Sequence, residues 1–349
     1  MSNSSLKMLS GFIAPRIEPV PAGIERPLWS VMIPTFNRTE YLRRTLESVL
    51  AQDPGRDKMQ IEVVDNCSTS DDPEPVVSAV AGDRITFTRN SQNLGLMRNF
   101  NRCIERAHGN LIHILHSDDY VEPTFYSVIG DLAERYPNCG FLATRVFFVD
   151  ESEVIIGVTP RVKWMENPTW DVTPMLSTQY FQCAGVVVRR ELYERCGGFI
   201  PELVYTGDWE MWVRTVHCGS AVVHPHPLAN YRKSAGYETG RLARSGENIR
   251  DYLRLSAHLS GYPGFSPTTL PDAAALQALD QYYRFIAEGD VAAAQANLQA
   301  YKDVVPFPAW AISGALNRIR HLLQNVSRFA EKTTRRIVMP RSQVKLYRD

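Results

Sequence analysis

The stretch that decides the fold is LIHILHSDDYVEP, residues 111–123. Its apolar first half has the length and composition of a short buried strand. The run then ends in His116, Ser117 and two adjacent aspartates, Asp118 and Asp119. Burying a carboxylate beside such a strand costs free energy unless a partner compensates the charge. In an open parallel sheet, ligands bind outside the carboxyl ends of the strands, so these residues mark a candidate binding site.

Strand and helix patterns alternate on both sides of this stretch. Short apolar strands are predicted at residues 29–33, 61–64, 85–90 and 111–115, and amphipathic helices at residues 39–52, 73–82, 93–110 and 123–136. Short apolar strands separated by helices are typical of a parallel sheet that is buried on both faces. The expected fold class is therefore α/β, with a mostly parallel central sheet and helices on both faces.

Three residues are expected to set the ends of these elements. Pro34 should end the first strand, because proline has no N–H to donate to a ladder. Thr39 should cap the helix that follows through its side-chain oxygen. Gly109 should occupy the left-handed position just after the third helix.

The downstream sequence completes the predicted domain organisation. Further strands are expected at 140–150, 181–190 and from 220 onward, a short helix at 208–218, and a long irregular stretch at 151–178. From about residue 249 the periodicity is helical. We therefore expect an N-terminal tail at 1–27, an α/β domain at 28–240 and a helical C-terminal region at 241–349, with no internal repeat.

Composition and charge exclude several classes of protein. The 349 residues hold 38 basic and 38 acidic side chains, so the net charge gives no general attraction to nucleic acid. The six cysteines form no CxxC pair, which indicates neither a zinc site nor a disulfide framework, and reduced thiols in the cytoplasm are expected. No apolar run approaches the roughly 18 residues of a membrane span.

The last segment of the chain is basic and carries an apolar stripe. The stripe consists of Leu316, Ile319, Leu322, Leu323 and Val326. Two interpretations stay open for this predicted helix. It docks on the α/β domain, or it lies on an anionic membrane surface as a peripheral contact.

Two nucleotide-binding devices are missing from the expected strand ends. No GxGxxG follows the first strand and no GxxxxGK[ST] occurs, which disfavours a dinucleotide site and excludes a P-loop. A diphosphate would then need another source of positive charge. A divalent cation held by carboxylates supplies it, and Asp118 and Asp119 suit that task. The polar residues 34–38 and Asp65 also follow strands, so they should converge with the aspartates.

Three segments together resemble a known family. In order along the chain, these segments are SVMIPTFNRTEYLRRTLESVLAQ, IEVVDNCSTSDD and NLGLMRNFNRCIERAHGNLIHILHSDDYVEP. Their order and spacing are similar to those of family 2 of the inverting glycosyltransferases. The likeness is extended to about residue 214 by GVVVRRELYERCGGFIPELVYTGDWEMWVR. The C-terminal third is not covered. The resemblance implies a GT-A fold, the nucleotide-diphospho-sugar transferase fold, for the α/β domain, with a C-terminal helical extension.

The resemblance also implies a set of site residues. The implied nucleotide contacts are Pro34, Thr35, Asn37, Arg38, Asp65, Arg98, Ser117, Asp118 and Arg232. Among them, Asp65 would accept a hydrogen bond from a base N–H. Asp118 and Asp119 would hold Mn²⁺ or Mg²⁺ on the diphosphate. The donor would be a UDP-, GDP- or dTDP-sugar, and its base stays open.

The implied catalytic base is Asp208. It would accept the proton of an acceptor hydroxyl as that oxygen attacks the anomeric carbon, while the metal stabilises the departing nucleotide diphosphate. A single displacement inverts the configuration at that carbon. The acceptor would be a saccharide, a lipid-linked group or a small molecule, in the synthesis of a surface glycan or polysaccharide.

Two departures from the family pattern keep alternatives open. His116 stands where the first aspartate of the metal motif is usual, and Gly207 stands where a glutamate precedes the base; Glu210 is a reserve candidate for that base. One alternative is a module that binds nucleotide sugar without turnover. Another is a sugar-1-phosphate nucleotidylyltransferase, which the absence of a glycine-rich N-terminal loop disfavours.

Structural interpretations of the same residues also stay open. The adjacent aspartates suit an acidic turn, and Asp208 suits a helix N-terminus, where the dipole stabilises a carboxylate. Trp209 and Trp212 share a helix face, which indicates core packing or, alternatively, a platform for an acceptor sugar.

Overall fold

The computed structural model describes residues 12–233 and 238–305, and the chain divides into two compact units. One unit comprises the chain up to residue 237 together with residues 254–267, and the other comprises residues 238–253 and the chain from residue 268 onward. The basic helix predicted near the C-terminus lies outside the described residues.

The first unit is built on one mixed sheet. Its strands are β1 (Trp29–Thr35), β2 (Met59–Asp65), β3 (Thr86–Arg89), β4 (Leu111–Ile114), β5 (Tyr120–Val121), β6 (Cys139–Val149), β7 (Ile155–Val158), β8 (Val186–Arg189) and β9 (Ser220–Arg232). Their order is β3-β2-β1-β4-β8-β6-β9-β5, with β7 paired to β6. The first four strands are mutually parallel, whereas β8 runs antiparallel to β4 and β6.

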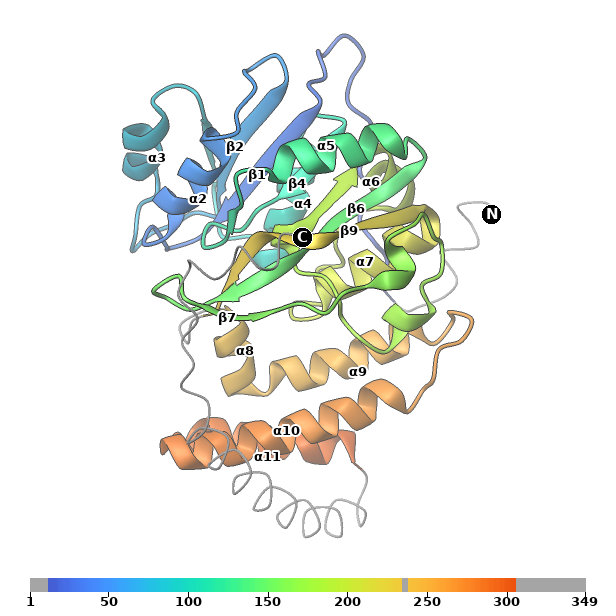
Figure 1. Ribbon diagram of the computed structural model, residues 1–349. Coiled ribbons are helices and arrows are strands. Elements are labelled where there is room, and N and C mark those ends of the chain that lie inside the picture. The colour runs from blue at the N-terminus through green and yellow to red at the C-terminus, as the bar shows by residue number, and fades with distance from the viewer. Residues whose placement is uncertain (1–11, 234–237, 306–349) are drawn as a thin grey trace. The chain divides into compact units, whose positions relative to one another are not determined.

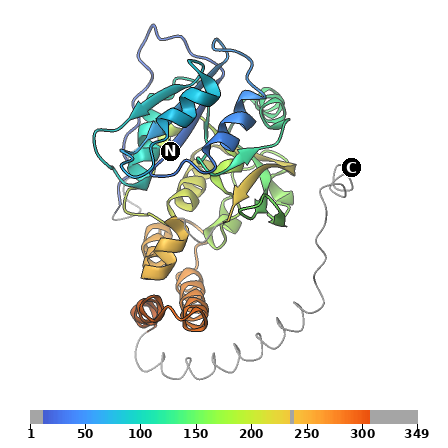
Figure 2. The same cartoon turned by 90° about the vertical axis from the view of Figure 1, so that its left-hand side faces the viewer.

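Helices cover both faces of this sheet (Figure 1). They are α2 (Leu42–Leu50), α3 (Glu74–Ala81), α4 (Leu96–Arg106), α5 (Phe125–Arg135), α6 (Arg190–Cys196) and α7 (Gly207–Cys218). One buried apolar cluster joins α2, α3 and α5 to alternate residues of β1 and β2, so these three helices share a face. The sheet is also seen between its helices in Figure 2. The predicted α/β class with helices on both faces is confirmed.

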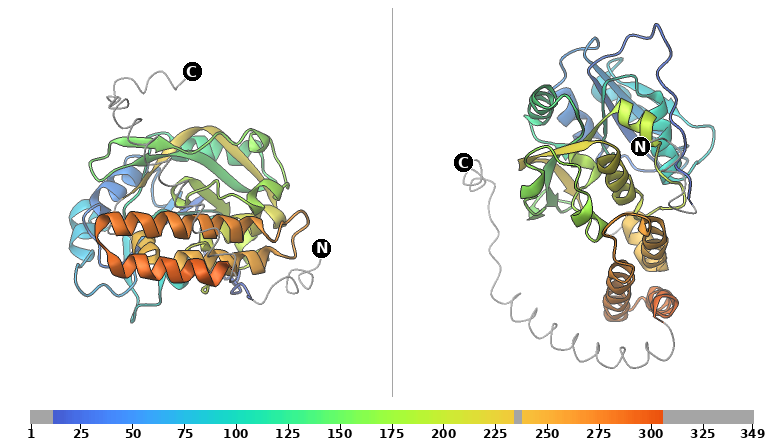
Figure 3. Two further views of the ribbon diagram at one scale, coloured as in Figure 1. Left: turned by 90° about the horizontal axis from the view of Figure 1, so that it is seen from below. Right: turned by 90° about the vertical axis from the view of Figure 1, so that its right-hand side faces the viewer.

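The second unit is helical. Its described residues belong to α8 (Glu238–Ser245), the first part of α9 (Glu247–Leu259), α10 (Thr269–Glu288) and α11 (Val291–Val304). The last two run side by side (Figure 3) and bury alanines such as Ala278 and Ala300 together with Tyr301. Asp290 caps α11 by accepting a hydrogen bond from the N–H of Ala293. Helices are thus present in the region where the sequence predicts them.

The prediction that Pro34 ends the first strand is wrong. β1 runs on to Thr35, and Pro34 is paired with Val64 of β2. The carbonyl of Met32 accepts a hydrogen bond from the N–H of Leu115, so the backbone polar groups of Met32 face the β4 side. Orientation alternates along a strand, so the backbone of Pro34, two residues later, faces the same side. The β1–β4 pairing ends at Met32, so no ladder bond is lost at the proline.

Thr39 and Gly109 also differ from their predicted positions at helix ends. α2 begins after Tyr41, and the Thr39 hydroxyl donates to Asp71 instead. α4 ends at Arg106 with Ala107 as its C-cap, so Gly109 lies three residues beyond the helix. A Cβ on Gly109 would lie 2.5 Å from the carbonyl carbon of Trp29, so the glycine allows two backbones to approach closely.

Replacing Gly109 with alanine is therefore expected to destabilise the first unit by about 1–3 kcal/mol, the usual cost of overpacking. The clash is with backbone atoms of β1, which cannot turn away as a side chain would. Urea unfolding followed by tryptophan fluorescence measures the effect. Gly130→Ala in α5 is the matched control, because its Cβ would lie 3.8 Å from the Trp29 ring and alanine favours a helix. Equal stability of the two variants would contradict the prediction.

Candidate functional site

The strand register places three polar loops at one edge of the sheet. Thr35 at the end of β1 pairs with Asp65 at the end of β2. Leu115 donates to the Met32 carbonyl, and the adjacent aspartates follow within four residues. The predicted convergence of the loops after β1, β2 and β4 is confirmed, because parallel strands end at the same edge.

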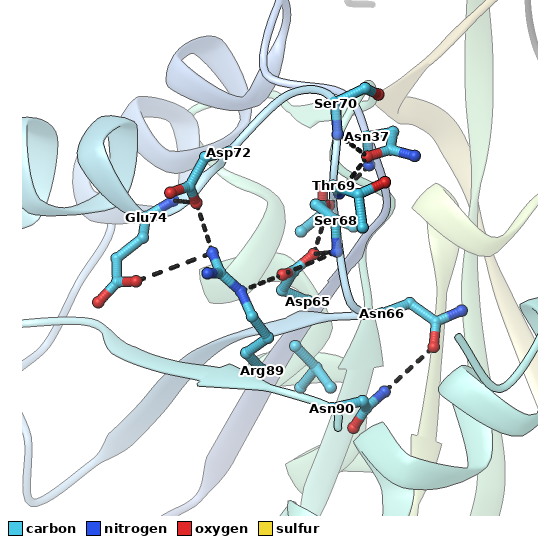
Figure 4. A network of polar contacts seen from close by, with 12 residues as sticks. Asn37, Asp65, Asn66, Ser68, Thr69, Ser70, Asp72, Glu74, Arg89 and Asn90 are labelled. Carbon is cyan, nitrogen blue, oxygen red and sulfur yellow. Dashed lines mark hydrogen bonds and ion pairs between the residues drawn. The ribbon is translucent and has the colours of Figure 1, made fainter. Parts of the chain in front are cut away.

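Asp65 organises the loop that follows β2 (Figure 4). Its Oδ1 accepts a hydrogen bond from the Ser68 hydroxyl at 2.5 Å, and its Oδ2 accepts one from Nε of Arg89 at 2.6 Å. The Ser68 N–H lies 3.2 Å from both oxygens. The Arg89 guanidinium also pairs with Asp72. The side chain of Asp65 is wholly buried, so the structure gives it a loop-building role, and contact with a nucleobase stays a prediction.

Asn37 ties the loop after β1 to the loop after β2. Its side-chain oxygen accepts hydrogen bonds from the N–H groups of Thr69 and Ser70 at 2.7 and 2.9 Å (Figure 4). Its own N–H donates to the Ser68 hydroxyl. Asn37 has a φ of 47°, a left-handed conformation that asparagine tolerates better than most residues. The residue thus fixes the shape of the candidate nucleotide loop.

The remaining predicted nucleotide contacts differ in their surroundings. Thr35 is buried at the end of β1 and donates to the Arg38 carbonyl. The Arg38 guanidinium lies 3.9 Å from an Asp118 oxygen, which links the first loop to the aspartates. Arg98 is exposed on α4, and Ser117 is buried beside the aspartates.

His116, Asp118 and Asp119 form a cluster with the donors of a metal site. Each offers one ligand atom, and these atoms lie within 4.8 Å of one another. Oδ1 of Asp119 accepts a hydrogen bond from the backbone N–H of Arg232 at 2.9 Å. Oδ2 of Asp119 and Nε2 of His116 are buried and have no hydrogen-bond partner among the described residues.

These donors fit a divalent cation. Burial, and then the charge of Asp118, raise the pKa of Asp119 well above its ordinary value. A buried carboxylate oxygen without a donor is costly, and a cation placed at that oxygen would compensate the charge. The two carboxylates and the imidazole together supply oxygen and nitrogen donors for a divalent cation.

The side chain of Arg232, a predicted diphosphate contact, is engaged by protein groups. Its side chain is wholly buried beneath the aspartate loop. The guanidinium binds protein oxygens of two loops, namely the carbonyls of Asp118, Asp150 and Glu151 and a carboxylate oxygen of Glu153, and it stacks on the Tyr41 ring at 4.1 Å. Arg232 thus braces the backbone that carries the metal-ligand candidates, and its contact with a diphosphate stays a prediction.

Asp208 and Asp119 lie around a common neighbour, Cys183. The Cys183 thiol is buried, and burial, followed by the charges of Asp208 and Asp119, raises its pKa well above the ordinary value. Asp208 is the second residue of α7, and its carboxylate accepts a hydrogen bond from the Gln179 side chain at 2.9 Å. The base candidate and one metal-ligand candidate are therefore close enough for their charges to act on one thiol.

Glu210 does not suit the role of reserve base. It is wholly buried, and its oxygens bond to the Arg214 guanidinium at 2.7 Å and to Nε2 of His258 at 3.0 Å. These partners lower the pKa of Glu210 to about 2 against the opposing effect of burial. Trp209 and Trp212 are also buried, which confirms the core-packing interpretation over the sugar platform.

The Glu210 ion pair predicts a pH-dependent stability difference. A folded pKa depressed to about 2 gives stability that is present above the unfolded pKa and is lost as pH falls through the folded pKa. We expect Glu210→Gln to cost about 3 kcal/mol at pH 7 and progressively less between pH 5 and pH 2. Urea unfolding of both proteins at each pH measures the difference. A difference that stays constant down to pH 2 would contradict the role of the ion pair.

Comparison with known proteins assigns the family. The sequence model described as glycosyl transferase family 2 matches residues 30–197. A relative in Mycobacterium tuberculosis CDC 1551, the uncharacterized protein MT1568, is 30% identical over 290 residues, which cover 75% of this chain and 85% of that protein. The chain belongs to glycosyl transferase family 2. The resemblance read from the sequence is confirmed.

Two further proteins indicate what this glycosyltransferase is similar to. A 103-residue segment, 29% of this chain and 36% of the other, is 38% identical to WcaA of Escherichia coli K12, which is named as a glycosyl transferase of colanic acid biosynthesis. A mannosyltransferase of Pyrobaculum calidifontis, solved with GDP-Man and Mn²⁺, superposes with a TM-score of 0.51 at 20% identity and covers 91% of this chain and 86% of its own. This superposition confirms the GT-A fold.

Two site residues of this glycosyltransferase were missed from the sequence. Gln179 lies between the predicted irregular stretch and the next predicted strand, Cys183 lies inside that predicted strand, and neither residue type signals a site by itself. Only the fold brings them to Asp208. In the part of the chain that the structure describes, no helix is long and apolar enough to cross a membrane.

Proposed function

We propose that the chain transfers a sugar from a nucleotide-diphosphate donor to an acceptor hydroxyl, with inversion and with the help of a divalent metal. The observation that carries this proposal is the cluster of His116, Asp118 and Asp119 at the loop edge of the sheet, in which a buried Asp119 oxygen has no hydrogen-bond partner among the described residues. The charges of Asp208 and Asp119 both act on the buried Cys183 thiol. The family supplies the reaction class, and these residues supply the groups that the reaction needs.

The proposed roles follow from the chemistry of each side chain. Asp118 and Asp119, with His116, would hold Mn²⁺ or Mg²⁺, and the bound ion would neutralise the diphosphate as it leaves. Arg38, 3.9 Å from Asp118, would add positive charge at the same edge. Asp208 would accept the proton of the acceptor hydroxyl. Burial of Cys183 raises its pKa, which keeps the thiol neutral between the two carboxylates.

The donor, the acceptor and the location are proposed more coarsely. The Pyrobaculum enzyme binds GDP-Man, which supports a nucleotide-sugar donor, with UDP, GDP and dTDP all to be tested. The name of WcaA supports a saccharide or lipid-linked acceptor in surface polysaccharide synthesis. We further propose a cytoplasmic protein in which residues 28–240 form the catalytic domain. For the basic C-terminal segment, docking on this domain and peripheral contact with a membrane both stay open.

A panel of donors tests the proposed function. The protein is incubated with Mn²⁺ and UDP-, GDP- or dTDP-sugars, with and without saccharide or lipid-linked acceptors, and nucleotide release is followed. We expect acceptor-dependent release with one class of donor. Binding without release across the acceptor set would support the alternative of a binding module. Formation of nucleotide sugar from a nucleoside triphosphate and a sugar phosphate would support a nucleotidylyltransferase.

A further inference from the structure

The carboxylate of Asp208 is held from two sides. Its Oδ1 accepts a hydrogen bond from the backbone N–H of Trp209 at 2.8 Å. Its Oδ2 accepts one from Nε2 of Gln179 at 2.9 Å. The first bond is local to α7, whereas Gln179 belongs to the segment between two short 3-10 helices, Thr173–Leu176 and Cys183–Gly185. The orientation of Asp208 therefore depends in part on a distant segment of the chain.

The segment that carries Gln179 is itself braced on α7. The indole N–H of Trp209 donates to the Met175 carbonyl at 2.7 Å, and this bond is buried. Nε2 of Gln179 also lies 3.4 Å from the Phe181 carbonyl. These bonds deliver the amide to Asp208 from a fixed backbone. A partner held in this way orients a reacting group at little cost in entropy.

The residue before Asp208 does not provide a neighbouring carboxylate. The family pattern read from the sequence has a glutamate at this position, and this chain has Gly207. A Cβ on Gly207 would lie 2.6 Å from Sδ and 2.9 Å from Cε of Met97. Any side chain there would require Met97 to move. A polar neighbour for Asp208 therefore has to come from elsewhere in the fold.

We propose that Gln179 is the positioning residue for Asp208. Its amide N–H orients one carboxylate oxygen and favours the ionised form, which is the form that accepts a proton, because a hydrogen bond to the charged form of an acid stabilises that form. The inference rests on the proposed function, in which Asp208 is the base.

Three other titratable groups lie near Asp208 or on its helix, and the structure accounts for each of them. The Cys183 thiol, which feels the charge of Asp208, is kept neutral because burial raises its pKa. Asp119 acts on the same thiol and lies with the metal-ligand candidates. Glu210, on the same helix, is bound to Arg214 and His258. Among the described residues, Gln179 is the side chain whose amide reaches the carboxylate directly.

A titration that needs no turnover tests the hydrogen bond. The protein is labelled with ¹³C-aspartate, and the Asp208 carboxyl signal is assigned by its loss in Asp208→Asn. In Gln179→Ala the titration midpoint of that signal is expected to rise by about one pH unit, because the bond that favours the charged form is lost. Gln182→Ala, from the same segment, is the matched control and should leave it unmoved. An unchanged midpoint in Gln179→Ala overturns the proposal.

Kinetics then separate positioning from mere support of the fold. Gln179→Ala should lower kcat by about ten- to a hundredfold with the KM for the donor unchanged. Gln179→Glu places two carboxyls in contact, so activity should fall as the pH rises through the second ionisation of the pair, where both are charged and repel, while the wild type stays active. The same pH profile in Gln179→Glu and wild type would overturn the proposal. The two failures can be told apart. If Gln179→Ala shifts the titration midpoint but the wild-type protein shows no transferase activity, the proposed function is overturned and the hydrogen bond is still supported.

Discussion

Replacing Asp208 with asparagine is expected to lower kcat by about 100- to 10,000-fold, the usual contribution of a positioned general base. The amide has the shape of the carboxylate and still accepts the hydrogen bond from the Trp209 N–H, but it cannot take a proton from the acceptor. Donor affinity should stay within about twofold, because the loss falls on the transition state alone. Nucleotide release at saturating donor and acceptor gives kcat, and calorimetric titration with nucleotide gives the affinity.

The control for this substitution is Asp131→Asn, the same chemical change at an exposed position of α5. It should leave both kcat and donor affinity unchanged. Full activity in Asp208→Asn would remove Asp208 from the mechanism. An equal loss of donor binding would instead assign Asp208 to the nucleotide site.

The fold was predictable from the sequence because its signals are local. Short apolar strands and amphipathic helices gave the class, and the ends of parallel strands share an edge by geometry alone. The errors occurred where a distant contact decides the backbone. Pro34 stays in β1 because the pairing of β1 with β4 has already ended. Gly109 is needed where its backbone approaches β1 closely, and it does not mark the end of a helix. Neither partner is visible in the local sequence.

The candidate site was predictable in position and less so in detail. The aspartate doublet was found because it follows a predicted strand, and Asp208 because its position matches that of the catalytic base in the family that the sequence resembles. The uses of Asp65 and Arg232 were not predictable, because their partners come from other loops. Asp65 is bound to Arg89, 24 residues later in the chain, and the Arg232 guanidinium is bound to the Asp118 carbonyl, 114 residues earlier. Long polar side chains find such partners only when the fold brings backbone carbonyls within reach.

This use of Arg232 changes what the metal-site substitutions should reveal. The Arg232 guanidinium donates to the Asp118 carbonyl, and the backbone N–H of Arg232 donates to the Asp119 carboxylate. Arg232 therefore supports Asp118 through its carbonyl and Asp119 through its carboxylate. Truncating Asp118 beyond its Cβ leaves that bracing in place, because the guanidinium contacts only the carbonyl of this residue. Asp118→Ala is thus a cleaner probe of metal binding than any change at Asp119.

Asp118→Ala is expected to weaken Mn²⁺-dependent binding of nucleotide by at least about tenfold, since one carboxylate ligand and its charge are lost. Binding measured in the presence of EDTA should be the same in the variant and the wild type, because the metal no longer contributes to either. Calorimetric titrations of UDP, GDP and dTDP with and without Mn²⁺ give the four affinities for each base. Asp131→Ala, an exposed aspartate on α5, should keep the full metal effect. A metal effect of wild-type size in Asp118→Ala would show that this carboxylate does not hold the ion, and the ligand set of the proposed function would then be wrong.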